Sequence, residues 1–222
     1  MKKLLICLLW AAFTTVSRAA IPPSEDLLPS DTLFLFTIPD CTTLETATHQ
    51  SPQWLFWNDP AMKPFHDKFM SRFKETFLGP LERDLGVNPA DFTGLLQGQF
   101  TFAVTQNGWT GGDDSSPGVV LLLDTRDKSA LLQTNLEALK KKWRGEGKAI
   151  RTEDVHGISF SVVTLSSNDF PSLSGFLPRR QPVQELGRET PPDKPAELAV
   201  GQFESLLIVG NSVKAVEPVA AH

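Results

Sequence analysis

The pattern of hydrophobic and polar positions changes between strand-like and helix-like periods along the chain. A short apolar, β-branched run at 31–40, closed by Pro39, predicts a strand buried early in a sheet. Two runs at 98–108 and 117–124 flank a polar, glycine-containing loop and predict a hairpin. Four further strands are predicted over 149–165, with a turn near His156, and over 196–212, with GQFES as the turn.

Helix start signals separate these strands. Ser51, Asp59 and Asn88 are capping residues, and each is followed by a proline at the first helical position. A longer helix begins at Asp127 and ends near Gly145, and one of its faces is apolar. The residues of that face are Leu132, Leu136, Leu139 and Trp143.

A stripe of aromatic residues marks the helix that follows Asp59. It comprises Met62, Phe65, Phe69, Phe73 and Phe77, at spacings of three and four, and the helix is predicted to end at Gly79 and Pro80. Burial of each side chain would stabilise the fold by roughly 2 kcal/mol. We therefore interpret the stripe as part of the core, and an apolar-ligand carrier as an alternative use of it.

The order of elements predicts the fold class. Hairpins outnumber the strand–helix–strand crossovers, which favours an α+β fold with a mostly antiparallel sheet and helices packed on one face. Six prolines between 170 and 195 predict an exposed loop within a single domain that covers 20–222.

The first 19 residues have the layout of a secretory signal peptide. Lys2 and Lys3 precede an apolar run, and small residues predict cleavage after Ala19. The run is too short for a membrane anchor, so we expect a periplasmic or secreted protein without stable membrane insertion.

Cleavage removes three positive charges, with Arg18 the third, and lowers the formal net charge from -5 to -8. This acidic balance argues against nucleic acid and anionic membranes as partners.

Cleavage at this site also leaves one cysteine, Cys41, in an oxidising compartment. One cysteine cannot form an internal disulfide, so the fold must depend on its hydrophobic core. We interpret Cys41 as a small buried hydrophobe, with a reactive thiol or an intermolecular bridge as the alternatives.

The sequence carries few signs of catalytic or cofactor chemistry. It contains no G-x-S-x-G, H-E-x-x-H or C-x-x-C motif, and GEGKAI at 145–150 follows a helix where a phosphate-binding turn should follow a strand. Asp113 and Asp114 lack the other ligands of a calcium loop. The four histidines are scattered along the chain, so we predict no metal site and no cofactor.

Aromatic residues supply the candidate interaction surface. Trp54, Phe56 and Trp57 crowd a helix too short to bury all three on one face. One ring is either an exposed binding anchor or is covered by a neighbouring helix. Trp109, in the hairpin loop, is the second candidate.

Four segments together resemble a domain-of-unknown-function family of secreted bacterial proteins. They are LLPSDTLFLFTIPD, SPQWLFWNDPAMKPF, DLGVNPADFTGLLQGQFTFAV and GQFESLLIVGNSVKAV. The resemblance spans nearly all of the chain after the signal peptide, but it carries no activity or site residues. It implies an exported α+β protein and a pattern that continues past position 222.

The leading functional hypothesis is a non-enzymatic exported protein that binds a protein partner or a small ligand. The alternatives are a hydrolase-type enzyme with a site assembled from dispersed residues and the apolar-ligand carrier.

The C-terminal run LLIVGNSVKAVEPVAAH predicts a strand and the start of a helix in which Pro218 lies too far inside. We therefore expect a truncated chain whose last residues are frayed.

Overall fold

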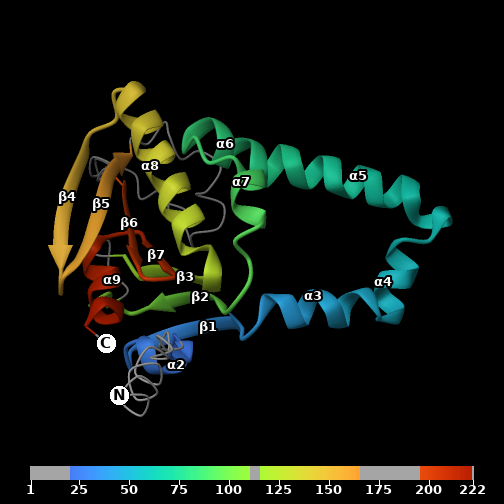
Figure 1. The fold of residues 1–222 in the computed structure, drawn as a ribbon, viewed down its shortest axis with the longest axis horizontal. Helices are drawn as coiled ribbons and strands as arrows, with labels where there is room; N and C mark the ends of the chain where they lie inside the picture. Colours follow the sequence, from blue (N-terminus) through green and yellow to red (C-terminus); the bar gives the residue numbers. More distant parts are fainter. Residues whose placement is uncertain (1–20, 111–115, 166–195, 222) are drawn as a thin grey trace, which may run out of the picture.

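A seven-stranded antiparallel sheet is the centre of the structure, a computed structural model that describes residues 21–110, 116–165 and 196–221 (Figure 1). The strand order is β1-β2-β3-β7-β6-β5-β4. The strands are β1 (Thr32–Ile38), β2 (Phe100–Thr105), β3 (Gly118–Asp124), β4 (Ile150–Val155), β5 (Ile158–Leu165), β6 (Ala196–Phe203) and β7 (Leu206–Gly210). The predicted α+β class with an antiparallel sheet is confirmed.

Helices connect the strands and cover the sheet. They are α2 (Ser24–Leu27), α3 (Cys41–His49), α4 (Pro52–Trp57), α5 (Lys63–Phe73), α6 (Gly79–Asp84), α7 (Pro89–Thr93), α8 (Ser129–Gly145) and α9 (Val213–Ala220). Two short 3-10 helices, η1 (Pro60–Met62) and η3 (Arg126–Lys128), and a π-helical segment, η2 (Lys74–Leu78), complete the set.

In the described ranges, no helix is long and apolar enough to cross a membrane. The predicted signal peptide with its cleavage after Ala19, Asp113 and Asp114, and the proline-rich loop at 170–195 lie outside the described residues.

Helix α8 covers one face of the sheet, as its apolar period predicts. Leu132, Leu136, Leu139 and Trp143 are buried against residues of β3, β5, β6 and β7. The Trp143 indole N–H donates a 2.6 Å hydrogen bond to the Leu85 carbonyl, so the one polar atom of this large side chain is satisfied inside the core.

Helix α9 packs on the opposite face of the sheet. Helices were expected on one face only, but they cover both faces. Ala215, Val216, Val219 and Ala220 are buried there against β3, β5, β6 and β7. The Ser212 hydroxyl accepts the Ala215 N–H and caps the helix. The expectation of frayed last residues is therefore wrong: burial of this apolar face outweighs the cost of Pro218 inside the helix.

The chain also stays helical where an end was predicted at Gly79 and Pro80. Segment η2 links α5 to α6, and the Gly79 N–H donates to the Lys74 carbonyl, five residues earlier. A π turn of this kind widens the helix by one residue. The next residue, Pro80, has no N–H to donate, so the regular ladder of hydrogen bonds is interrupted at this point of the helix.

Candidate functional site

A helical arm projects from the sheet between β1 and α7 (Figure 1). We define this arm as α3, α4, η1 and α5. Its first root is fixed to the sheet layer because the Cys41 N–H donates to the Gly98 carbonyl at 2.9 Å. Its second root continues through η2 and α6 to Leu85, whose carbonyl accepts the Trp143 indole N–H. Both ends of the arm are thus held by the body of the protein.

Asp40 organises the first root. Its carboxylate accepts the Thr43 N–H at 2.8 Å and caps α3. The Arg126 guanidinium, from η3 beside the end of β3, lies 2.5 Å from the other carboxylate oxygen. The Thr43 hydrogen bond and the Arg126 charge hold the pKa of Asp40 below its ordinary value.

Local caps turn the chain at the far end of the arm. The Ser51 hydroxyl accepts the Trp54 N–H, and Pro52 is at the first position of α4. Asp59 accepts the Ala61 N–H in the same way before α5. These starts, which the sequence predicted, let the chain reverse direction within about a dozen residues.

The aromatic stripe of α5 is exposed, so its expected place in the core is wrong. Phe65, Phe69 and Phe73 are 56%, 49% and 36% exposed. Consecutive rings of the three stack at 6.5 and 6.4 Å. Met62 is half-buried, and the side chain of Phe77 lies outside the described set. Among the described residues, no other layer of the fold covers Phe65 and Phe69, because the arm extends beyond the sheet.

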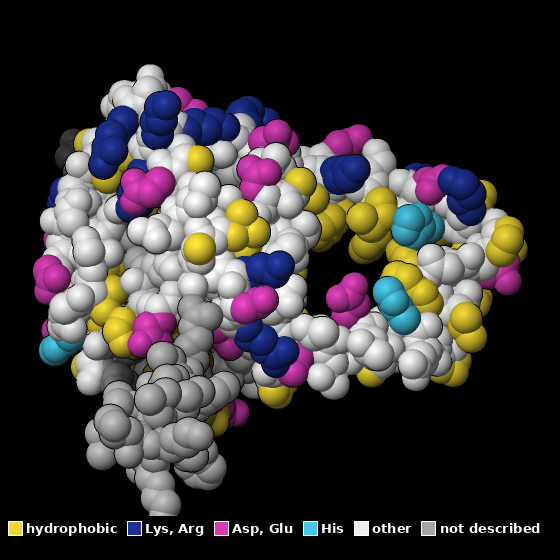
Figure 2. All heavy atoms as spheres, in the orientation of Figure 1, with side chains coloured by type: hydrophobic (Ala, Val, Ile, Leu, Met, Phe, Trp, Pro, Cys, Tyr) yellow, Lys and Arg dark blue, Asp and Glu magenta, His cyan; other side chains and the backbone are white. Residues whose placement is uncertain are grey.

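Figure 2 shows where the stripe lies. The two limbs of the arm, α3 and α5, enclose an opening, and hydrophobic side chains gather on the α5 side of it. Leu44, on α3, is also exposed. We call the surface formed by Phe65, Phe69 and Phe73 the arm hollow.

The other face of α5 is polar. Lys63 and Asp67 form an i,i+4 ion pair at 2.6 Å, and the hydrogen bond from Lys63 lowers the pKa of Asp67. The His66 ring also contacts Asp67, at 3.3 Å. Charged and apolar side chains therefore lie on different faces of α5, which makes it an amphipathic helix.

The three aromatic residues of α4 have different environments. Trp54 packs on the His49 ring at 4.3 Å, and Trp57 meets Phe65 and Phe69 edge-on at 5.9 and 5.6 Å. Both indoles are half-buried. Because Trp57 contacts Phe65 and Phe69, it closes the outer end of the arm hollow. Phe56 is 62% exposed, and it is the ring of this group that is left free.

Trp109, the second sequence candidate, belongs to a different surface. It is half-buried in the connection between β2 and β3, where its backbone N–H donates to the Gln106 carbonyl and the Gln106 amide donates to the Trp109 carbonyl. It is thus part of a turn and is not brought together with the aromatic residues of the arm.

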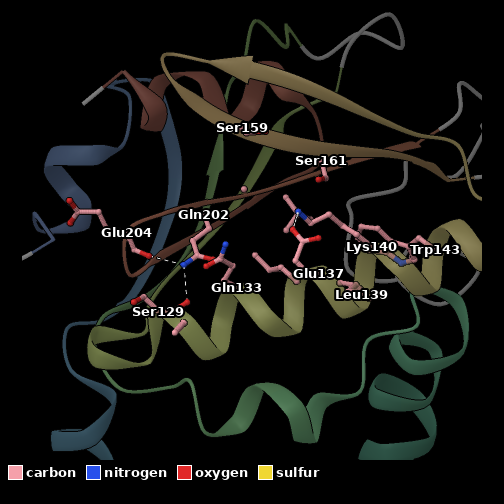
Figure 3. A pocket seen from close by; sticks show the side chains of 14 residues that line it. Ser129, Gln133, Glu137, Leu139, Lys140, Trp143, Ser159, Ser161, Gln202 and Glu204 are labelled. Atoms are coloured by element: carbon pink, nitrogen blue, oxygen red, sulfur yellow. Dashed lines mark hydrogen bonds and ion pairs between the residues drawn. The ribbon is translucent and has the colours of Figure 1, made fainter.

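A groove of about 590 Å³ lies between α8 and strands β5 and β6 (Figure 3). Its polar lining includes Gln133, Glu137, Lys140, Ser159, Ser161 and Gln202. Sequence reasoning missed this groove because its residues come from three elements that only the fold brings together.

Three polar side chains of the groove, Glu137, Lys140 and Gln202, have partners within it. Lys140 and Glu137 form an ion pair at 2.6 Å, and the Gln202 amide donates to the carbonyls of Ser129 and Glu204 at 3.0 and 2.8 Å. The two arm histidines engage Asp67 and Trp54 on the far side of the molecule. The groove therefore offers no nucleophile paired with a histidine base among the described residues.

Metal and thiol chemistry also have little support in the described ranges. These ranges hold no cluster of three or more His, Cys, Asp or Glu side chains that could bind a metal ion. Cys41 is a free, half-buried thiol. Burial and the neighbouring Asp40 charge raise the pKa of this thiol, which disfavours the reactive thiolate.

No protein-family model matches the chain, and no curated protein or solved structure is significantly similar to it. The fold class rests on the structure itself, and the resemblance to a family of secreted bacterial proteins stays a hypothesis.

Proposed function

We propose that this is an exported, non-enzymatic interaction protein that binds an amphipathic helix of another protein in the arm hollow. The observation that carries the proposal is the exposed row formed by Phe65, Phe69 and Phe73 on an arm fixed at both roots. Export rests on the pattern of residues 1–19, with its two lysines and apolar run.

The shape of the row favours a helix as the partner. Its rings recur every four residues on α5, and such ridges pack into the grooves of a second helix. The row covers two turns, which is about 12 Å along the axis. A partner helix of three or four turns with an apolar face would span it, in the helix-in-groove mode of recognition.

The three rings alone do not supply enough free energy for a complex. Burial of a half-exposed phenylalanine contributes roughly 1 kcal/mol, so the three rings supply about 3 kcal/mol. Association costs at least about 4 kcal/mol in lost freedom of motion. Further contacts at the exposed Leu44 and Phe56 are therefore part of the proposed interface.

The alternative of an apolar-ligand carrier has weaker support. Ligand sites of that kind bury most of the ligand surface, whereas the arm hollow is an opening between two limbs (Figure 2). A small apolar molecule on Phe69 would keep much of its surface in water. The groove beside α8 has a lining that is mainly polar (Figure 3).

A site-specific photo-cross-linker tests the proposal. It is placed at Phe69 in the cell that produces the protein, and the cross-linked peptide is identified. Phe203 is the matched control, because it is the same residue type with the same 49% exposure but lies in β6. We expect the probe at position 69 to label an apolar helical segment of one partner and the probe at position 203 to leave it unlabelled.

Affinity for the identified segment then decides the role of the ring. Phe69→Asp should weaken binding at least about tenfold, whereas Phe203→Asp should leave it unchanged. Phe69→Asp also removes the ring contacts of Phe69 with Trp57, Phe65 and Phe73. Hydrogen exchange in α4 and α5 of this variant therefore checks that the arm keeps its structure. Equal labelling from both positions, or equal affinities of the two variants, would refute the proposal.

A further inference from the structure

A second exposed apolar feature lies on β1, at the edge of the sheet, so the prediction that this strand is buried is wrong. In the described part of the chain, β1 pairs with β2 along one side only. Four consecutive side chains, Leu33, Phe34, Leu35 and Phe36, are 56%, 54%, 37% and 49% exposed. An edge strand also presents a row of unpaired backbone N–H and C=O groups, which a further strand can satisfy.

Within the strand, this edge lacks the charges and prolines that normally prevent strand pairing. Natural edge strands carry lysine, other charges or proline within the strand, but β1 reads TLFLFTI and contains none of these. Pro39 follows the strand, and the one irregularity in its register lies between Thr32 and Phe34. The stretch from Phe34 to Ile38 is regular.

We propose that β1 pairs with β1 of a second copy of this chain, antiparallel and about a two-fold axis at Leu35. The sequence around Leu35 makes this pairing self-complementary. The axis sets Leu35 opposite Leu35, and it sets Phe34 of each copy opposite Phe36 of the other. Aromatic residues directly opposite each other on antiparallel strands are a favourable cross-strand pair. The irregular Leu33 falls at the end of this ladder.

The neighbouring strand extends the aromatic contact. Phe34 already meets Phe102 of β2 edge-on, with ring centroids 6.2 Å apart. Phe36 is directly opposite Phe102 in the register and therefore shares its face of the sheet. The two-fold axis would join these rings from both copies into one aromatic strip across the sheet junction.

The absence of charge favours a second copy as the partner, and the exposed area indicates the strength of the contact. A strand without charges can meet its own copy without opposing like charges, although the whole chain is acidic. With about half of roughly 200 Å² exposed per side chain, the four residues offer on the order of 400 Å² per copy. Stable interfaces bury about 800 Å² per partner, so the dimer is weak and reversible.

This self-association is independent of the arm. The β1 edge and the arm hollow share no residues, and the paired strands would leave Phe69 exposed. Phe69→Asp should therefore have no effect on dimer formation, and the loss of either interface can be detected without the other.

A charge-swap experiment tests both the partner and the register. Analytical ultracentrifugation of the chain without residues 1–19 should show a monomer–dimer equilibrium at concentrations up to about 1 mM. Phe34→Lys or Phe36→Glu alone should weaken self-association at least about tenfold. An equimolar mixture of the two variants should restore it, because the proposed register sets position 34 opposite position 36. Phe203→Lys is the control on a matched exposed phenylalanine.

Cysteine cross-linking gives a second measurement. In a Cys41→Ser background, Leu35→Cys should form a covalent dimer under mild oxidation, because the two-fold axis sets the two thiols opposite each other. Leu44→Cys, on the arm, should react much more slowly, although Leu44 is more exposed than Leu35. A chain that stays monomeric throughout the concentration range, a mixture that does not recover association, or equal cross-linking at both positions would each overturn the proposal.

Discussion

The Arg126 guanidinium lies 2.5 Å from the Asp40 carboxylate, although the two residues are 86 positions apart in the sequence. Asp40 caps the first helix of the arm, and Arg126 follows β3 in the middle of the sheet. The contact therefore ties the start of the arm to the body. The Asp124 carboxylate supports it, because it accepts the backbone N–H of Arg126 and the hydroxyl of Ser205.

This contact predicts a pH dependence for the first root of the arm. The pKa of Asp40 is lowered by the Thr43 hydrogen bond and by Arg126, so its stabilising effect is complete above the unfolded pKa of about 4. The effect is lost as pH falls through the lower folded pKa. Hydrogen exchange at the Thr43 amide should accelerate in that acidic range before the sheet amides respond.

Asp40→Asn is the control for this assignment. Asparagine still caps the helix but has no charge to titrate and forms no ion pair with Arg126. The acid-induced change at Thr43 should be absent in this variant. An unchanged pH profile would show that another carboxylate is responsible.

Trp143→Phe should destabilise the protein by about 1–3 kcal/mol, because the substitution leaves the buried Leu85 carbonyl without its donor. Urea denaturation would measure the change. Trp57→Phe, in the half-exposed ring cluster of the arm, should shift the free energy of unfolding by less than about 0.5 kcal/mol. Equal losses in the two variants would contradict a structural role for the Trp143 hydrogen bond.

Gly210→Ala should loosen the contact between α9 and the sheet. A Cβ on Gly210 would overlap Cγ1 of Val216, which is fully buried. Overpacking of this kind costs about 1–3 kcal/mol. The double variant with Val216→Ala should recover part of that loss, and thermal denaturation of the four proteins of the cycle would measure the coupling.

Gly145→Ala is the matched control for this cycle. It ends α8, and a Cβ there would meet no atom within 4 Å. Its backbone conformation also suits a side chain, so the free energy of unfolding should stay the same or rise by up to about 1 kcal/mol. A loss of stability equal to that of Gly210→Ala would contradict the proposed clash.

Trp57→Ala should loosen the outer end of the arm without unfolding the sheet. The substitution removes the edge-on ring contacts with Phe65 and Phe69, each of which contributes about 0.5–1.5 kcal/mol. We expect faster hydrogen exchange in α4 and at the start of α5, with unchanged exchange in β3 and β7. A uniform change over all these segments would instead place Trp57 in the global core.

The strands of the sheet and helix α8 were largely predictable from the sequence. The strand runs specify the elements, and the apolar period of α8 specifies the face that is buried against the sheet. The two-residue turn at His156 and Gly157, both with positive φ, also lies where the turn signal placed it. In each of these cases the information is local, so a single sequence contains it.

The exposed arm was not predictable in the same way. The period of Phe65, Phe69 and Phe73 shows that they share a face, but it does not show what that face meets. That depends on where α3 and α5 leave the sheet, which is set by contacts such as Asp40 to Arg126 between distant positions. The groove beside α8 escaped prediction for the same reason.

The position of β6 and β7 in the sheet has a consequence for the order of folding. These strands come late in the chain, yet they lie in the middle, with β7 paired to β3 and β6 paired to β5. The early strands β1 to β3 therefore cannot join the hairpin of β4 and β5 in one sheet until residues 196–210 have been synthesised. We expect slow, cooperative formation of the sheet around this late insertion, since distant strand pairing must precede the completed core.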